Sequence, residues 1–259
     1  MYQALDTSLI AGTLFIAMLV LLEVGRRVGN GRLASDPEGA RAGTGAVEGA
    51  VFGLLGLLIA FTFSGAASRF DARRDLVVQE SNAIGTAYLR LDLLPADAQP
   101  AMRETFRQYL DARLDVYREL PDLQASDAAL ATAARLQADI WNAALTDGQH
   151  TGAMPDAVKL LVPALNDMFD VASSRTMATQ MHPPTVIYGL LYLMALASAL
   201  LAGYGMAGGR SRSWLHVIAF PAVMAIAVFI IIDIEYPRLG LIKVDSFDQA
   251  LVELRASMD

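Results

Sequence analysis

The chain has 259 residues, a formal net charge of −7, 54% apolar residues and a mean hydropathy of +0.40. This apolar content exceeds that of ordinary soluble domains, and the acidic balance excludes the basic surface on which nucleic-acid binding depends. The absence of cysteine excludes disulfides, thiolate metal sites and cysteine nucleophiles.

Four strongly apolar stretches occur in two pairs along the chain, at residues 8–22, 50–67, 185–207 and 214–234. A helix crosses a bilayer core with about 20 apolar residues, and it satisfies its own backbone hydrogen bonds there. We therefore predict an all-α membrane protein with four transmembrane helices in two hairpins, near residues 8–24, 48–67, 185–206 and 214–233. The lipid bilayer is then its first partner.

The chain accordingly divides into a first transmembrane hairpin, a soluble helical insert, a second hairpin and a C-terminal turn with an amphipathic tail, at residues 1–67, 68–181, 182–234 and 235–259. No Lys or Arg precedes the first apolar stretch, and so we interpret it as a retained helix rather than a signal peptide. The glycines of the segment VGRRVGNGR predict the C-terminal end of this helix, which makes residues 29–46 a connecting loop.

The second apolar stretch has no stop signal, because proline is absent from Val47 until Pro95 and the sequence turns amphipathic after Ser68. A single helix over Val47–Leu94 has 48 residues and extends roughly 72 Å at about 1.5 Å per residue. Since a bilayer core is about 30 Å thick, this helix should project well beyond the membrane.

Three further helices are expected in the insert, because apolar side chains recur there at helical spacing. The three faces consist of Met102, Phe106, Tyr109, Leu110, Arg113 and Tyr117; of Leu130, Ala133, Leu136, Ile140, Trp141, Ala144 and Leu145; and of Val158, Leu161, Val162, Leu165, Met168, Phe169 and Ala172. No alternating strand pattern interrupts them, and the insert is therefore predicted to be a helical bundle.

Small residues form a stripe on the second apolar helix at intervals of three or four, namely Gly49, Gly53, Gly56, Ala60, Ser64 and Ala67. Small side chains let helix backbones approach closely in a membrane. The stripe either packs within one subunit or lies at the symmetry axis of a homo-oligomer, where Leu57 and Phe61 narrow a pore.

Charged residues follow directly where this helix leaves the apolar span. Arg69, Asp71, Arg73 and Arg74 predict an interfacial belt with internal ion pairs, and an anion-attracting vestibule is the alternative. Further along, Glu80 and its neighbours Ser81 and Asn82 are expected to face solvent or to lock a helix register, with a ligand role as the alternative.

No constellation of residues in the sequence predicts an enzyme. The three histidines, His150, His182 and His216, have no carboxylate or second histidine at ligand spacing, and no phosphate-binding loop or nucleophile elbow is present. We expect neither a cofactor nor a metal. No ionisable residue interrupts the middle of a span, which disfavours an ion-coupled transporter, and Asp233 and Glu235 are expected to mark the membrane interface.

Arginines near the short loops give the expected orientation in a bacterial inner membrane. The first loop region carries Arg26, Arg27, Arg32 and Arg41, and the second carries Arg210 and Arg212. The positive-inside rule therefore places both hairpin loops in the cytoplasm and the insert, residues 68–181, outside it.

The segment GLLGLLIAFTFSGAASRFDARRDLVVQESNAIG, residues 53–85, resembles the pore-helix region of bestrophins. In those proteins a Gly-rich apolar helix runs into an Arg-aromatic-acidic-Ala-Arg junction, which residues 69–73 match. The stretch ARRDLVVQESNAIGTAYLRLDLLP, the four-helix layout and the closing E-Y-P-x-x-G-x-I-x-V run at residues 235–244 resemble the bestrophin-like family of bacterial membrane proteins, whose function is unknown. This second likeness covers nearly the whole chain.

The resemblance to bestrophins implies a pentameric anion channel whose neck is lined by the second helix, with apolar residues near Leu57 and Phe61. It also implies a cytoplasmic insert, opposite to the arginine count, while the calcium-binding acidic cluster of bestrophins has no recognisable counterpart here. The predicted function is a homo-oligomeric, bestrophin-like channel for small anions. The alternative is a non-conducting membrane scaffold or sensor whose helical domain binds a partner.

Overall fold

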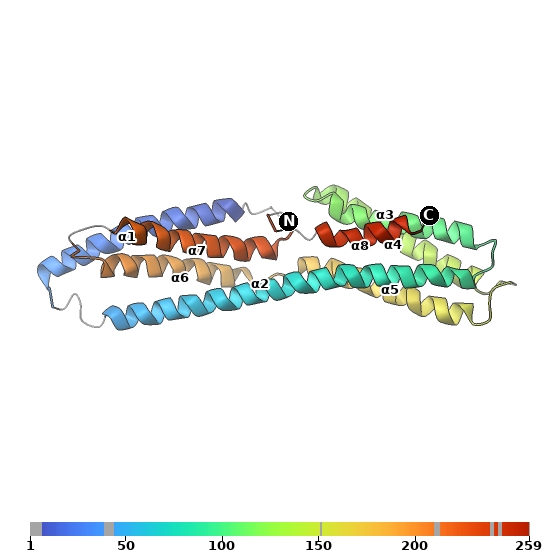
Figure 1. Ribbon diagram of the computed structural model, residues 1–259, viewed down its shortest axis with the longest axis horizontal. Helices are drawn as coiled ribbons and strands as arrows, with labels where there is room; N and C mark the ends of the chain where they lie inside the picture. Colours follow the sequence, from blue (N-terminus) through green and yellow to red (C-terminus); the bar gives the residue numbers. More distant parts are fainter. Residues whose placement is uncertain are drawn as a thin grey trace. The chain divides into compact units, whose positions relative to one another are not determined.

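The computed structural model describes residues 7–38, 44–150, 152–209, 213–238, 241–242 and 245–258 (Figure 1). Within these residues the secondary structure is helical and contains no strand, which confirms the predicted all-α class. The helices are α1 (Thr7–Ser35), α2 (Thr44–Leu89), the 3-10 helix η1 (Arg90–Leu93), α3 (Gln99–Arg118), α4 (Leu123–Asp147), α5 (Ala157–Gln180), α6 (Thr185–Gly205), α7 (Trp214–Glu235) and α8 (Asp245–Ala256).

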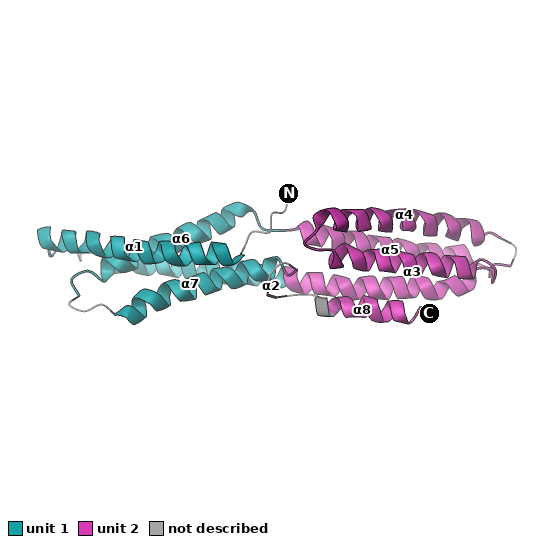
Figure 2. Ribbon diagram, turned by 90° about the horizontal axis from the view of Figure 1, so that it is seen from above, with its two compact units in different colours: residues 1–68, 182–236 teal, residues 69–181, 237–259 magenta. Residues whose placement is uncertain are grey.

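The chain forms two compact units, coloured separately in Figure 2. Unit 1 comprises residues 1–68 and 182–236 and contains α1, the first part of α2, α6 and α7. Unit 2 comprises residues 69–181 and 237–259 and contains the remaining helices together with the second part of α2. The C-terminal residues thus join the same unit as the insert.

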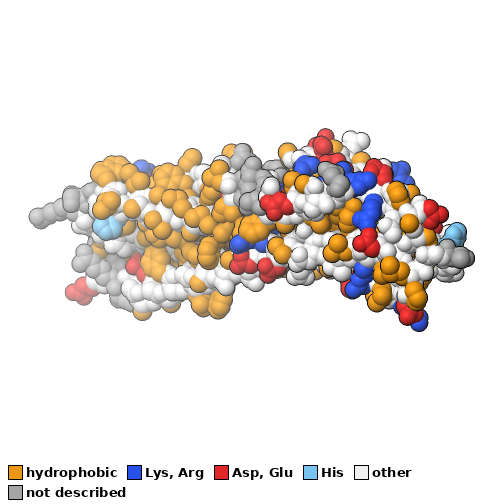
Figure 3. Space-filling model, turned by 45° about the vertical axis from the view of Figure 1, so that its right-hand side comes forward, with side chains coloured by type: hydrophobic (Ala, Val, Ile, Leu, Met, Phe, Trp, Pro, Cys, Tyr) orange, Lys and Arg blue, Asp and Glu red, His pale blue; other side chains and the backbone are white. Residues whose placement is uncertain are grey.

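Four helical segments of the described chain are long and apolar enough to cross a membrane, and they contain α1, α2, α6 and α7. Their most apolar windows have mean hydropathies of 2.0 to 2.7. On the face drawn in Figure 3, hydrophobic side chains dominate unit 1, whereas most charged side chains gather over unit 2.

Helix α1 does not end at the glycines of VGRRVGNGR, contrary to the sequence prediction, and continues to Ser35. Two of these glycines serve close packing against α6 instead. A Cβ added to Gly25 would lie 2.0 Å from the carbonyl oxygen of Leu200, and one added to Gly203 would lie 2.1 Å from that of Leu22. The backbones of α1 and α6 can approach this closely only because neither glycine carries a side chain.

Because α1 extends beyond its predicted end, some of the arginines used to predict the orientation in the membrane lie on a helix and not in a loop. Arg26 and Arg27 lie on the helix rather than in a loop, and both pair with Glu23, at 3.1 and 2.8 Å. Arg41, Arg210 and Arg212 lie outside the described residues. The orientation in the membrane therefore stays a prediction.

Helix α2 is one unbroken helix of 46 residues, as the missing stop signal predicted. Its buried side chains recur on one face along both of its parts, first as Leu55 and Ala66 and then as Arg73, Val77, Glu80, Ile84 and Ala87. η1 follows at once and buries Leu91.

The core of unit 2 is shared by α2, α3, α4, α5 and α8. The predicted faces of α3, α4 and α5 are the ones that are turned inward, with Phe106, Ile140 and Leu165 fully buried. Leu251 of α8 joins this core together with Met258, which follows the helix, so that the predicted amphipathic tail packs on the helical insert.

Candidate pore helix and a buried charge network

The glycines of the small stripe of α2 have no packing contact with other described residues of the chain. Among the residues that the structure describes, no atom from elsewhere in the fold lies within 4 Å of a Cβ built on Gly49, Gly53 or Gly56. Ala60 and Ser64 are exposed as well, and Ala67 is half-buried. This disfavours close packing within one subunit, which was one of the two interpretations of the stripe.

The bulky residues beside the stripe are also exposed. Leu57 has 51% of its surface accessible and Phe61 has 68%, so neither contributes to the core of unit 1. Thr62 satisfies its own hydroxyl by donating to the carbonyl oxygen of Leu58 at 2.8 Å, as expected for a membrane helix. Within the described part of the chain, this side of α2 is therefore apolar and exposed, and its glycines have open space beside them.

The four residues of the predicted interfacial belt differ in burial and in their partners. Arg73 is buried, and its guanidinium donates to the carbonyl oxygens of Ala178 and Met181 at 3.1 and 3.0 Å, at the end of α5. Arg74 pairs with Asp71 at 3.0 Å, an internal ion pair of the predicted kind. Arg69 is half-buried and Asp71 is exposed.

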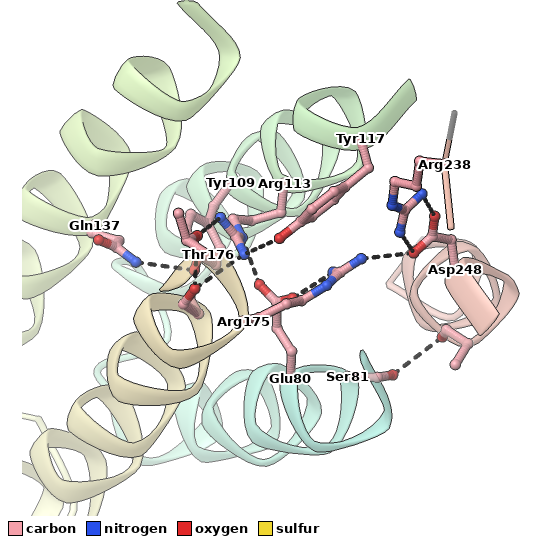
Figure 4. Close-up of polar contacts among 12 residues, drawn as sticks. Glu80, Ser81, Tyr109, Arg113, Tyr117, Gln137, Arg175, Thr176, Arg238 and Asp248 are labelled. Atoms are coloured by element: carbon pink, nitrogen blue, oxygen red, sulfur yellow. Dashed lines mark hydrogen bonds and ion pairs between the residues drawn. The ribbon is translucent and has the colours of Figure 1, made fainter. Parts of the chain in front are cut away.

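Unit 2 contains a network of charged side chains that is buried at Glu80, Arg113 and Arg175 and partly accessible at Arg238 and Asp248 (Figure 4). Glu80 of α2 has no exposed surface, and its two carboxylate oxygens accept hydrogen bonds from Arg113 of α3 and Arg175 of α5, each at 2.5 Å. Arg175 also donates to Asp248 of α8 at 2.7 Å. Asp248 accepts two further bonds from Arg238, at 2.8 and 3.1 Å.

Tyr117 of α3 lies at the centre of the three guanidinium groups. Its ring centroid is 3.8 Å from the guanidinium carbon of Arg175, 4.5 Å from that of Arg238 and 5.7 Å from that of Arg113. Cations over an aromatic face are attracted by its quadrupole, most strongly where water is excluded. The ring therefore adds to the two carboxylates in balancing the buried positive charge.

Burial and charge shift two pKa values in this region in the same direction. Desolvation alone would lower the pKa of Arg113, but attraction to Glu80 and to the hydroxyls of Tyr117 and Tyr109 outweighs it, and the pKa is raised. Burial raises the pKa of Tyr109, whose hydroxyl accepts a hydrogen bond from Gln137 at 3.1 Å. Arg113 is thus fixed as a cation and Tyr109 as a neutral phenol.

His182 has no carboxylate at ligand spacing in the sequence, but the fold brings one to it from a distant position. Its Nδ1 lies 3.1 Å from a carboxylate oxygen of Glu235, and its ring stacks on Tyr236 with centroids 4.5 Å apart. Both Glu235 and Asp233 are buried at the end of α7. Among the described residues, no group of three His, Asp or Glu side chains is placed to hold a metal ion.

A family model described as the Bestrophin-like domain matches residues 12–246. The chain belongs to the Bestrophin-like family. The predicted resemblance to the bestrophin-like family is thereby confirmed, and membership agrees with the four apolar helices in indicating a membrane protein.

The fold of the Bestrophin-like chain is shared with a solved bacterial protein. A mutant form of a bacterial bestrophin homolog from Klebsiella pneumoniae has a TM-score of 0.61 and 17% sequence identity, with 94% of this chain and 98% of that chain covered. At this identity the match establishes a common fold. A search of curated proteins found no match.

Proposed function

We propose that this Bestrophin-like protein is a homo-oligomeric ion channel in a bacterial inner membrane, with α2 lining the axis shared by its subunits. Small anions, the ions implied by the resemblance to bestrophins, are the proposed permeant species. The exposed small stripe of α2 is the observation that carries this proposal.

The chemistry of the stripe favours a protein neighbour over lipid. A helix side that faces only lipid gains nothing from glycine, because lipid chains conform to large apolar side chains. Glycine at close helix contacts, in contrast, lets backbones approach and increases van der Waals packing. Gly25 and Gly203 of unit 1 are examples of this use inside the subunit, and Gly53 and Gly56 offer the same surface to a neighbouring copy.

The exposed side chains next to the stripe are suited to narrowing a pore. Around a symmetry axis, copies of Leu57 and Phe61 would form apolar rings, and such constrictions gate by dewetting. The belt beyond the span, with Arg69, Asp71 and Arg74 at least partly accessible, is the proposed vestibule.

Native mass measurements and planar-bilayer currents on purified protein test the proposal together. Gly53→Leu and Gly56→Leu should lower the subunit number, because overpacking a close contact costs on the order of 1–3 kcal/mol. Gly189→Leu is the matched control, since Gly189 of α6 also has open space at its Cβ but lies off the stripe. Phe61→Ala should raise conductance without dissociating the assembly.

A non-conducting scaffold or sensor is the second candidate, and one surface of unit 2 favours it. Trp141 of α4 and Phe169 of α5 line a shallow open groove with the amides of Gln137, Asn142 and Asn166. Such a mixture of aromatic and amide groups is suited to a protein partner. An oligomer that passes no current under any ionic condition would favour this candidate over the channel.

A further inference from the structure

We propose that Glu80 is a positioning residue that fixes the rotation of α2 about its own axis, so that the small stripe faces outward. This inference rests on the proposed function, because it assigns the buried charge network a part in presenting the stripe to neighbouring copies.

The continuity of α2 connects the two features. Glu80 and Gly53 are 27 positions apart in one unbroken helix, and at about 100° per residue they lie on opposite sides of it. Leu55 and Ala66, the buried residues of α2 in unit 1, fall instead on the side of Glu80. Because one continuous helix carries both features, fixing the rotation of α2 at Glu80 also fixes the side of α2 on which the stripe lies.

Apolar packing alone leaves this rotation weakly determined. In the apolar span of α2 only 11% of the most hydrophobic window is buried within the chain. Leu, Ile, Phe and Gly surround the helix there on all sides, so that no amphipathic pattern marks an inner face. Hydrophobic contacts also lack direction, and several rotations of the helix would bury similar areas.

The ion pairs of Glu80 can determine the rotation of α2, because they form only in a defined geometry. The two oxygens of Glu80 bind guanidinium groups that come from two different helices, α3 and α5, and all three side chains are buried. Arg73, on the same side of α2, donates to the carbonyl oxygens of Ala178 and Met181. A rotation of α2 would break these bonds and leave charges unpaired in a dry interior, which is strongly unfavourable.

The absence of cysteine makes a direct test possible with one introduced thiol at a time. Ser64→Cys places a thiol on the stripe, and Leu55→Cys places one on the opposite, buried side. The rate of oxidative cross-linking between copies in membrane vesicles reports which side of α2 faces a neighbour. In the otherwise native chain, S64C should cross-link much faster than L55C.

Two variants of the charge network then distinguish a role of Glu80 in fixing the rotation of α2 from a role in stability alone. Glu80→Gln removes the charge, whereas Glu80→Met with Arg113→Met removes one carboxylate and one guanidinium together and leaves Arg175 paired with Asp248. Replacing a buried ion pair by apolar groups is often neutral or stabilising. The double variant also covers the case in which E80Q fails to fold. Asp111→Asn is the matched control, because Asp111 of α3 pairs at 2.9 Å with Arg255 of α8 and not with Glu80.

The positioning role predicts that the ratio of S64C to L55C cross-linking falls toward one in E80M/R113M and stays high in D111N. An undiminished ratio in folded E80M/R113M would overturn the inference while leaving the proposed function intact. Failure of S64C to cross-link in the native background would refute the proposed function, and this inference with it.

Discussion

The crossing of α1 and α6 allows a prediction whose size follows from the geometry. In Gly25→Ala, the new Cβ would lie 2.0 Å from the carbonyl oxygen of Leu200 and 2.9 Å from the backbone nitrogen of Tyr204. Ordinary contact begins near 3.4 Å, and both neighbours are backbone atoms that cannot rotate away. The two helices must therefore separate by about 1 Å or more, with loss of packing around the crossing.

Overpacking of this kind typically costs about 1–3 kcal/mol. For a chain of this size that corresponds to a fall in Tm of about 2–12 °C in detergent. Gly31→Ala is the control on the same helix: its Cβ would meet no described residue within 4 Å, and alanine favours a helix over glycine by up to about 1 kcal/mol. Thermal unfolding of the two variants should therefore shift in opposite directions. A G25A protein as stable as G31A would refute the close crossing.

Three further predictions concern the cap of α4, the buried phenol and the membrane orientation. Asp122→Ala should destabilise the protein by about 1 kcal/mol relative to Asp139→Ala in thermal unfolding, because only Asp122 accepts bonds from the backbone nitrogens of Gln124 and Ala125. Since burial raises the pKa of Tyr109, the unfolded phenol ionises first, and the free energy of unfolding should fall as pH rises above about 10. Tyr109→Phe should remove that part of the slope, and an unchanged pH profile would contradict it. Impermeant thiol labelling in intact cells should modify Gln124→Cys and spare Gly209→Cys if the insert is extracytoplasmic, and the reverse pattern would place it in the cytoplasm.

Local patterns in the sequence were sufficient for the helices and for their inner faces. Apolar residues at helical spacing marked the buried sides of α3, α4 and α5, and the missing stop signal marked the length of α2. The glycines of α1 were misinterpreted because a glycine that ends a helix and one that admits a neighbouring helix look alike in one sequence. Only the position of α6 distinguishes them.

The charge network could be predicted only in part. Arg113 on an otherwise apolar face was a usable signal, since a buried arginine requires a partner. Its partner Glu80 is 33 residues away, and Arg175 is 95 residues from Glu80, so no local spacing connects them. The contact of His182 with Glu235 was missed for the same reason, because the two lie 53 residues apart.

A reconstruction of the detergent-purified particle, at a resolution that places helices, tests the central claim most directly. The account predicts a closed, symmetric ring of identical subunits in which α2 is the helix nearest the axis, with Gly53 and Gly56 at the contact between neighbours. A monomer, or a ring in which the stripe of α2 faces the surrounding detergent, would contradict it.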